Sequence, residues 1–297
     1  MNAISRAKLR LVFAMTMFGT IGIFVRIIPL PSAAIAVVRG AIGALFLLIV
    51  SLARKTPPDV KSIRKNLRFL LPNGILMGFG WVLLFEAYRY TTVAIATLCY
   101  YFSPVIILLL SPLVLKEKLT RKKIFCILIA LVGMGLVSNV LQGVPEGETT
   151  AYTGVAMALV AAVLYAIIVL TNKRLEGISS QDATMTQLGV SAVVMLIYTL
   201  LTVNFSTLTY PPIGWGLFLG FGSMLVVAIF HTGFCYNLYF SAIAVLPAQT
   251  SALFSYIDPI MAMFLSATLL REGLTLTSAI GAVLVLGATL VSELTKD

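Results

Sequence analysis

Two ionisable residues lie inside long apolar runs, where a charge is costly, so each is a candidate for chemistry. Asp258, followed by Pro259, could accept a proton or face an ammonium group; alternatively it is a carboxylate hydrogen-bonded at a helix break. His231 is the only histidine, and its imidazole titrates close to neutral pH. The alternative for His231 is a hydrogen-bonded structural role. Both residues are predicted to bind substrate or to couple transport to a proton.

Arg39 and Glu86 are the second pair of candidates. Arg39 is expected about 10 Å inside an apolar span at 1.5 Å per residue, so it needs a carboxylate or carbonyl partner. It could bind a substrate carboxylate or brace an outer gate. Glu86 ends the next apolar run on the same side of the membrane, with Arg89 three residues later. We therefore predict a coupling or gating role for Arg39 and Glu86.

Aromatic side chains could complete a binding site, because their faces pack against amphipathic molecules and attract ammonium groups. Any one of them could equally be ordinary core. The aromatic residues predicted to bind substrate, together with Asp258 and His231, are Trp81, Tyr100, Tyr101, Tyr165 and Tyr256.

The composition specifies the environment in which these residues act. Of 297 residues, 60% are apolar and only 11% are charged, against about 25% charged in an ordinary soluble domain. Most of the chain must therefore be surrounded by lipid. The three cysteines lie in apolar runs without metal-ligand spacing, so neither disulfides nor a metal site is expected.

The apolar runs are continuous, not alternating, which predicts an all-α membrane protein and not a β-barrel. A spanning helix needs about 20 mostly apolar residues. The ten expected spans are 9–28, 32–53, 67–88, 91–115, 123–141, 152–171, 184–204, 213–236, 242–269 and 275–293.

Charges in the loops predict the orientation. The net charge is +10, and the loops on one side, with both termini, collect 17 of the 21 Lys and Arg residues. Basic loops remain in the cytoplasm. Both termini are therefore expected inside a cell membrane, and the loop 142–150 outside. Membrane orientation explains the positive charge better than a nucleic-acid partner does.

The chain also resembles itself at an offset of 155 residues. Pairing 92–120 with 247–275 gives nine identities in 29 positions, among them Pro104 with Pro259 and Glu117 with Glu272. We interpret both glutamates as capping or gating residues. Each copy would hold five spans, an odd number, so the copies must run in opposite senses. We predict two inverted five-helix repeats, 1–143 and 151–297, around a midplane site, an arrangement typical of transporters.

These features resemble the EamA-type drug/metabolite transporter superfamily. The resemblance is carried by Arg39 early in the second span, by Ser103-Pro104 followed by 115–120 (LKEKLT), and by Asp258-Pro259 followed by 270–275 (LREGLT). It covers almost the whole chain and implies a central cavity lined by spans 1–4 and 6–9. It does not specify the substrate.

The predicted function is secondary-active transport. No nucleotide-binding motif is present, so a gradient must supply the energy. We expect proton-coupled export, by alternating access, of a small organic metabolite that is amino-acid-like, amphipathic or cationic. The alternatives are an uncoupled facilitator or importer and, remotely, an intramembrane enzyme. The expected partners are substrate, protons and lipid, without a cofactor, in a monomer or homodimer.

Overall fold

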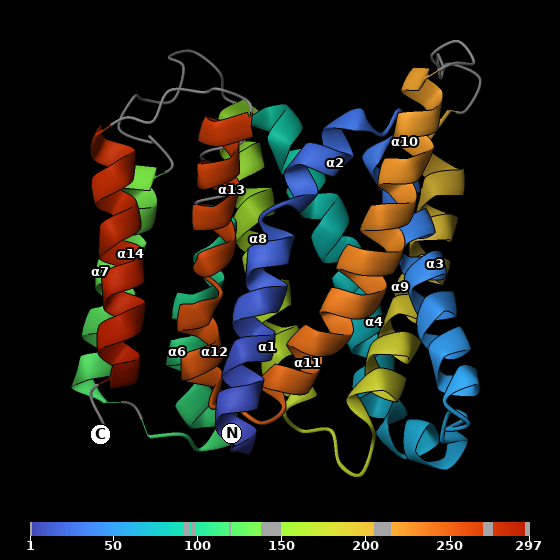
Figure 1. The fold of residues 1–297 in the computed structure, drawn as a ribbon, viewed down its shortest axis with the longest axis horizontal. Coiled ribbons are helices and arrows are strands. Elements are labelled where there is room, and N and C mark those ends of the chain that lie inside the picture. Colours follow the sequence, from blue (N-terminus) through green and yellow to red (C-terminus); the bar gives the residue numbers. More distant parts are fainter. Residues whose placement is uncertain are drawn as a thin grey trace.

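The computed structural model describes residues 2–91, 96, 99–118, 120–137, 150–204, 215–269 and 276–294. Within these ranges the regular structure is helical and contains no strand. The helices stand side by side in one bundle (Figure 1). The expected all-α architecture is therefore observed. The expected outer loop 142–150, apart from Thr150, and Glu272 lie outside the described residues.

The helices follow one another along the chain with short connections. Those of the first half are α1 (Ala3–Phe18), α2 (Ile21–Ile27), α3 (Ser32–Ala53), α4 (Val60–Tyr90), α6 (Ser103–Leu115) and α7 (Arg121–Val137). Those of the second half are α8 (Thr150–Asn172), α9 (Ser180–Thr202), α10 (Trp215–Leu225), the π-helix η3 (Val226–Cys235), α11 (Tyr236–Ile243), α12 (Ala248–Phe254), α13 (Ile257–Leu269) and α14 (Leu276–Leu294).

Six helical stretches of the described chain are long and apolar enough to cross a membrane. They are Ala3–Val25, Ser32–Ala53, Val60–Ala87, Tyr152–Asn172, Ser180–Thr202 and Phe218–Ile243. They correspond to expected spans one, two, three, six, seven and eight. The other four expected spans correspond to α6, α7, α12 with α13, and α14, which do not meet both conditions over their described residues. A count of ten spans therefore stays a prediction.

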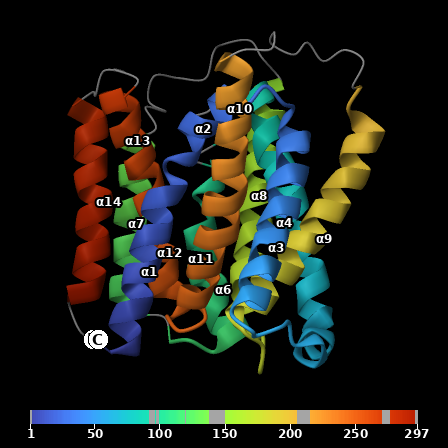
Figure 2. The same cartoon turned by 45° about the vertical axis from the view of Figure 1, so that its right-hand side comes forward.

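The expected boundary between spans eight and nine, at 236–242, is wrong. Helical structure runs without interruption from α10 through η3 to the end of α11 at Ile243, the continuous orange column in Figures 1 and 2. The next helix begins at Ala248, directly after Pro247. The apolar pattern continues past Tyr236, and the next residue that lacks the backbone N–H for a helical hydrogen bond is Pro247.

Four spans contain an irregularity, and these irregularities lie close to the predicted site residues. The first span breaks at Gly19 and Thr20, between α1 and α2. A turn at Ser255–Tyr256 separates α12 from α13, and a turn at 101–102 precedes α6. Pro104 and Pro259 stand in the first turn of the helices after these turns, where the missing N–H of proline is tolerated. The fourth irregularity, η3, lies in the middle of the eighth span.

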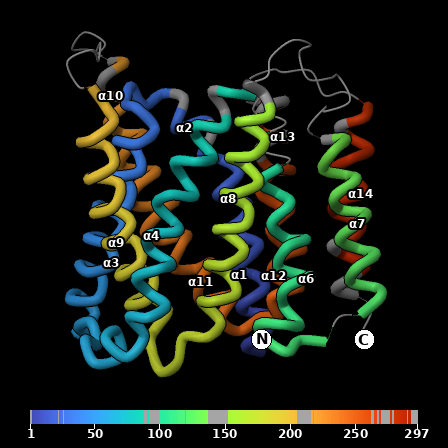
Figure 3. The backbone as a smooth tube through the Cα atoms, turned by 180° about the vertical axis from the view of Figure 1, so that it is seen from behind, coloured from blue at the N-terminus to red at the C-terminus, as the bar shows by residue number. Residues whose placement is uncertain are grey.

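Small residues bring the helices close together. A Cβ atom at Gly74 of α4 would lie 2.6 Å from Cβ of Val190 on α9. Gly43 of α3 and Gly233 of η3 are similarly enclosed, the latter by the Phe46 ring. Helix α7 packs along α14 at one edge of the bundle, as Figures 1 and 3 show from opposite sides. Close backbone approach of this kind is typical of helices that associate in a membrane.

One end of the bundle carries the basic loops. Figure 1 places the start of α1, the end of α14 and the loops after α3, α6 and α8 at this end, which we call the basic end. Helices α4 and α9 begin there with side-chain caps: Asp59 accepts from the backbone N–H of Lys61 and Ser62, and Ser179 accepts from that of Asp182. The hydrogen bond from the Ser62 hydroxyl, together with those from the Ser62 and Lys61 backbone N–H groups, holds the pKa of the exposed Asp59 carboxyl below its usual value.

Candidate functional site

Arg39 is a buried cation in the middle of the bundle. It projects from α3, its side chain is 3% exposed, and its Nε donates a 3.1 Å hydrogen bond to Oγ1 of Thr232 in η3. Its guanidinium carbon lies 4.3 Å from the centre of the Trp81 ring and 5.8 Å from that of Tyr236. None of the ion pairs within the described ranges involves Arg39. A hydroxyl and two aromatic faces therefore stand where a carboxylate or carbonyl was expected.

The π-helix positions the hydroxyl that contacts Arg39. In a π-helix each residue bonds five positions back, which widens the helix and leaves side chains in unusual directions. The Thr232 side chain bonds across the same spacing of five residues, because its Oγ1 donates to the carbonyl oxygen of Val227 at 2.8 Å. Gly43 lets α3 approach this turn, since a Cβ there would meet the Thr232 methyl group at 3.1 Å. The close packing of α3 on η3 thus places Arg39 against Thr232.

His231 lies on the same π-helix and points toward the break in the first span. Its Nε2 is 2.7 Å from Oγ1 of Thr20, and its Nδ1 is 3.3 Å from the carbonyl oxygen of Val226. The Thr20 hydroxyl donates its single proton to the carbonyl oxygen of Met17, at 2.8 Å, so its oxygen is left to accept a hydrogen bond from Nε2 of His231. His231 therefore joins the α1/α2 break to η3. Its predicted roles in binding and coupling stay predictions.

A series of aromatic rings in contact with one another begins beside Arg39. Trp81 of α4 donates from Nε1 to the Tyr236 hydroxyl at 3.2 Å, and their ring centres are 6.0 Å apart. Phe18, at the end of α1, lies 5.1 Å from the Tyr236 ring and 6.1 Å from the Tyr239 ring. Three helices that are distant in sequence thus contribute to one cluster of rings.

The cluster extends to the opposite side of the bundle through α8. The Tyr239 and Tyr165 hydroxyls share a short hydrogen bond, and the two rings are stacked 6.5 Å apart. The Tyr165 ring lies 5.7 Å from Tyr100, which lies 5.7 Å from Tyr101. Together with Phe18, Trp81, Tyr236 and Tyr239, these residues form what we call the aromatic wall.

Asp258 lies at the far end of the aromatic wall. It is half-buried in the first turn of α13, just after the break that follows α12, and Tyr101 is its hydrogen-bond partner. The neighbouring Tyr256 is fully buried, and its hydroxyl donates to the Tyr101 carbonyl oxygen at 3.2 Å. The wall therefore connects a cation, Arg39, with a carboxylate, Asp258.

The structure brings together most of the residues predicted from the sequence. Arg39, Trp81, Tyr100, Tyr101 and Tyr165 join Asp258 and Tyr256 in one continuous set of contacts. His231 adjoins this set through its neighbour Thr232. Glu86 is half-buried near the end of α4, and its role in coupling or gating stays a prediction.

Sequence reasoning did not assign Thr20, Thr232, Phe18, Tyr236 or Tyr239 to the site. One signal could have found Tyr236. It lies 155 residues after Trp81, the same offset that relates Tyr256 to Tyr101, and both pairs are in contact. The hydroxyls of Thr20 and Thr232 have no comparable signal.

The basic end is closed by hydrogen bonds between the two halves of the chain. Glu117, after α6, accepts from the backbone N–H of Ala248 at 2.9 Å, and Gln249 donates to Oγ of Ser111 at 3.1 Å. The Lys173 ammonium donates to the carbonyl oxygen of Leu246. Burial lowers the pKa of Lys173, and the nearby Glu117 charge opposes that shift.

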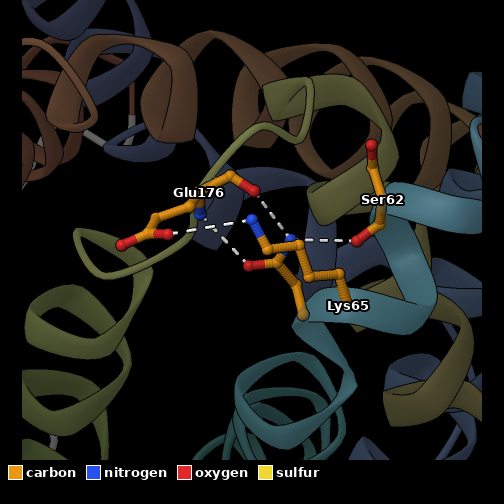
Figure 4. A network of polar contacts seen from close by, with 4 residues as sticks. Ser62, Lys65 and Glu176 are labelled. Carbon is orange, nitrogen blue, oxygen red and sulfur yellow. Dashed lines mark hydrogen bonds and ion pairs between the residues drawn. The ribbon is translucent and has the colours of Figure 1, made fainter.

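Beside this closure is a surface pocket lined by Lys65, Asn66, Arg68, Arg174 and Glu176, the basic-end pocket. Asn66 donates to the carbonyl oxygens of Ser62 and Glu176, both at 2.9 Å, and accepts from the Glu176 backbone N–H at 3.1 Å. Figure 4 shows Ser62 and Lys65 on α4 facing Glu176 across this contact. The Lys65 ammonium and the Glu176 carboxylate are 3.9 Å apart.

Comparison with known proteins identifies relatives over most of the chain. The model of the EamA-like transporter family matches residues 6–139 and again residues 152–293. The uncharacterized transporter YxxF of Bacillus subtilis strain 168 is 29% identical over 266 residues, which cover 88% of this chain and 81% of YxxF. The uncharacterized transporter YetK of the same organism is 26% identical over 196 residues, 65% of this chain and 58% of YetK.

A solved crystal structure has the same fold. It superimposes on the chain with a TM-score of 0.82 over 97% of both chains, although only 16% of the residues are identical. This likeness concerns the fold alone.

Proposed function

The chain belongs to the EamA-like transporter family and is a multi-pass membrane transporter, and from this premise we propose that it exports a small organic metabolite in exchange for protons. The substrate is amino-acid-like, amphipathic or cationic and binds along the aromatic wall. The chain lies in the cell membrane with its basic end, and so both termini, in the cytoplasm. It uses a gradient and no cofactor.

The observation that carries this proposal is the position of Asp258. A carboxylate at a break between two helix segments, in contact with a wall of aromatic rings, can release and accept a proton where substrate binds. In the other half of the chain the corresponding position is Ser103. The fold therefore does not need a charge there, which favours a role for Asp258 in coupling.

We further propose that residues 1–143 and 151–297 are inverted repeats that move against each other. The double match of the family model supports this. So do two contacts between residues 155 positions apart, Trp81 with Tyr236 and Tyr101 with Tyr256. In two bodies related by a two-fold rotation, a residue touches its own counterpart only close to the axis. The axis would pass through the aromatic wall.

Alternating access requires that the basic end opens at one stage of the cycle. The contacts that close it join the two halves: Glu117 to Ala248, Gln249 to Ser111, and Asn66 to Glu176. We assign these as the inner gate, with Glu117 as a gating residue. Arg39, Glu86 and His231 are the remaining proposed coupling or gating residues.

Purified protein in liposomes tests the coupling. The probe is radiolabelled L-phenylalanine, which offers an aromatic ring, a carboxylate and an ammonium group to the site. We expect an imposed pH gradient to drive its accumulation, and Asp258→Asn to reduce that accumulation at least about tenfold. Exchange of labelled for unlabelled phenylalanine without a gradient should persist in the variant, because binding and movement do not need the proton.

The matched control is Asp59→Asn, the same chemical change at an exposed helix cap, where asparagine caps as well as aspartate. It should transport as the unmodified protein does. Accumulation by the Asp258→Asn variant equal to that control would refute proton coupling through Asp258. Exchange in the unmodified protein that ignores the pH gradient would instead indicate an uncoupled facilitator.

A further inference from the structure

Arg39 is buried, yet it has more hydrogen-bond donors than the described residues have acceptors for them. A guanidinium carries five N–H groups in one plane. Thr232 accepts one of them, at 3.1 Å, and the Tyr236 hydroxyl is placed to accept a second. The described residues thus account for two of the five donors, and no carboxylate among those residues pairs with the charge.

The geometry of the neighbours leaves the remaining donors available. Trp81 lies over the guanidinium at 4.3 Å, where the ring attracts the cation. Thr232 accepts at Nε, the stem side of the group. The two terminal nitrogens form the fork that matches a planar carboxylate through two parallel hydrogen bonds.

We propose that Arg39 is the receptor for a carboxylate, or another planar oxyanion, of the transported molecule. This rests on the proposed function and deepens it, because it defines a substrate class: an organic acid or zwitterion whose aromatic or apolar body lies on Trp81 and Tyr236. Substrate then supplies the negative charge with which no described residue pairs Arg39. A fork held by Thr232 and Trp81 is already oriented before substrate arrives.

The two charges of the site have separate tasks in this arrangement. Arg39 and Asp258 are joined only through successive rings, Trp81 and Tyr236 near Arg39 and Tyr101 near Asp258. A carboxylate bound at Arg39 need not touch Asp258. An organic acid without an ammonium group should therefore bind, whereas an amine without a carboxylate should bind weakly.

Equilibrium binding to detergent-purified protein, without any gradient, tests the proposal. The probes are 3-phenylpropionate, its neutral amide 3-phenylpropionamide, and phenethylamine, which keep the ring and vary the head group. We expect 3-phenylpropionate to bind at least about tenfold more tightly than the other two, since hydrogen bonds to a charged partner are worth that much. Arg39→Met should remove this preference and leave the amide unchanged within about twofold.

Two further variants separate recognition from folding. Arg39→Lys keeps the charge without the fork, so it should weaken 3-phenylpropionate by about five- to tenfold and the amide not at all. Thermal unfolding in the same detergent checks that each variant is folded. If the Arg39→Met variant does not fold, the binding of the three probes to the Arg39→Lys variant tests the proposal.

Several outcomes would overturn the proposal: equal binding of all three probes by the unmodified protein, binding of none of them, or an equal loss for all probes in the Arg39 variants. The last result would make Arg39 a brace between α3 and η3. Because no gradient is applied, failure of proton coupling at Asp258 leaves this test intact. A lost carboxylate preference likewise leaves the coupling experiment intact.

Discussion

Two regions of the protein hold positive charge in opposite ways. Around Arg39 a single cation, 3% exposed, is enclosed by a hydroxyl and two aromatic rings. At the basic-end pocket three cations stand at the surface, and the Lys65 side chain is 69% exposed next to a Glu176 side chain that is 79% exposed. The first region has no carboxylate among its described neighbours, and the second has one.

The difference shows that a buried cation depends on its hydrogen-bond partners more than a cation at the surface does. Water at the surface screens each cation, so a loose pair at 3.9 Å adds little. Inside the bundle no such screening is available, so each hydrogen bond that the buried cation makes contributes more to stability. We therefore expect substitutions near Arg39 to matter more than substitutions in the basic-end pocket. Within the pocket, the buried Asn66 should matter more than its exposed charges.

The largest effect on stability is expected for Thr232→Val, which keeps the shape of the side chain and removes the acceptor of Arg39 Nε. We expect a loss of about 1.5–3 kcal/mol, because a donor on a buried charge is left unpaired. Thermal unfolding in detergent should show this as a Tm lower by several degrees.

Thr202→Val is the control for that change. The Thr202 hydroxyl also bonds a carbonyl oxygen of its own helix, that of Tyr198 at 2.8 Å, but the residue is exposed. Equal Tm changes for Thr202→Val and Thr232→Val would show that the contact with Arg39 contributes nothing.

A smaller effect is expected for Asn66→Ala. The change removes two hydrogen bonds between α4 and the loop after α8, together with one to the Ser62 carbonyl oxygen within α4, and should cost about 1–3 kcal/mol. Asn66→Asp retains the acceptor for the Glu176 N–H and should recover part of the loss. The same unfolding measurement checks both, and an alanine variant as stable as the unmodified protein would contradict the role assigned to Asn66.

The smallest effect is expected for Lys65→Ala, below about 0.5 kcal/mol, because its pair with Glu176 is exposed. What effect there is should disappear when unfolding is measured in high salt. A loss as large as that of Asn66→Ala would mean that the two regions do not differ as depth predicts.

The sequence predicts the helices well and their irregularities less well. The second span was expected at 32–53 and is Ser32–Ala53, because a hydrophobic run of this length has one arrangement in lipid. Pro259 pointed correctly to an interruption in its span, whereas no interruption was predicted at Pro104. The π-helix had no such marker, because its widening at Val226–Cys235 depends on contacts with α3 and α1.

The residues that meet in the candidate site could be singled out from the sequence one by one, but their pairings could not, and their roles stay predictions. Charges and rings in apolar runs are visible in a sequence, and Arg39, Asp258 and Trp81 were found in that way. The partner of Arg39 is 193 residues distant and is a threonine, a residue type common in membrane helices for many reasons. Only the fold distinguishes this hydroxyl from the others.

The contact between Trp81 and Tyr236 bears on how the two halves of the chain could have diverged in sequence. In a dimer of two identical chains, a contact at the rotation axis has the same residue on both sides. Such a residue must be able to pack against a second copy of itself. An indole N–H is a donor without an acceptor, and two facing tryptophans could not form the bond that Trp81 makes with Tyr236. In the proposed inverted repeat, Tyr101 and Tyr256 are identical counterparts, whereas Trp81 and Tyr236 are complementary ones. A single chain that carries both copies can encode a different residue on each side of the contact.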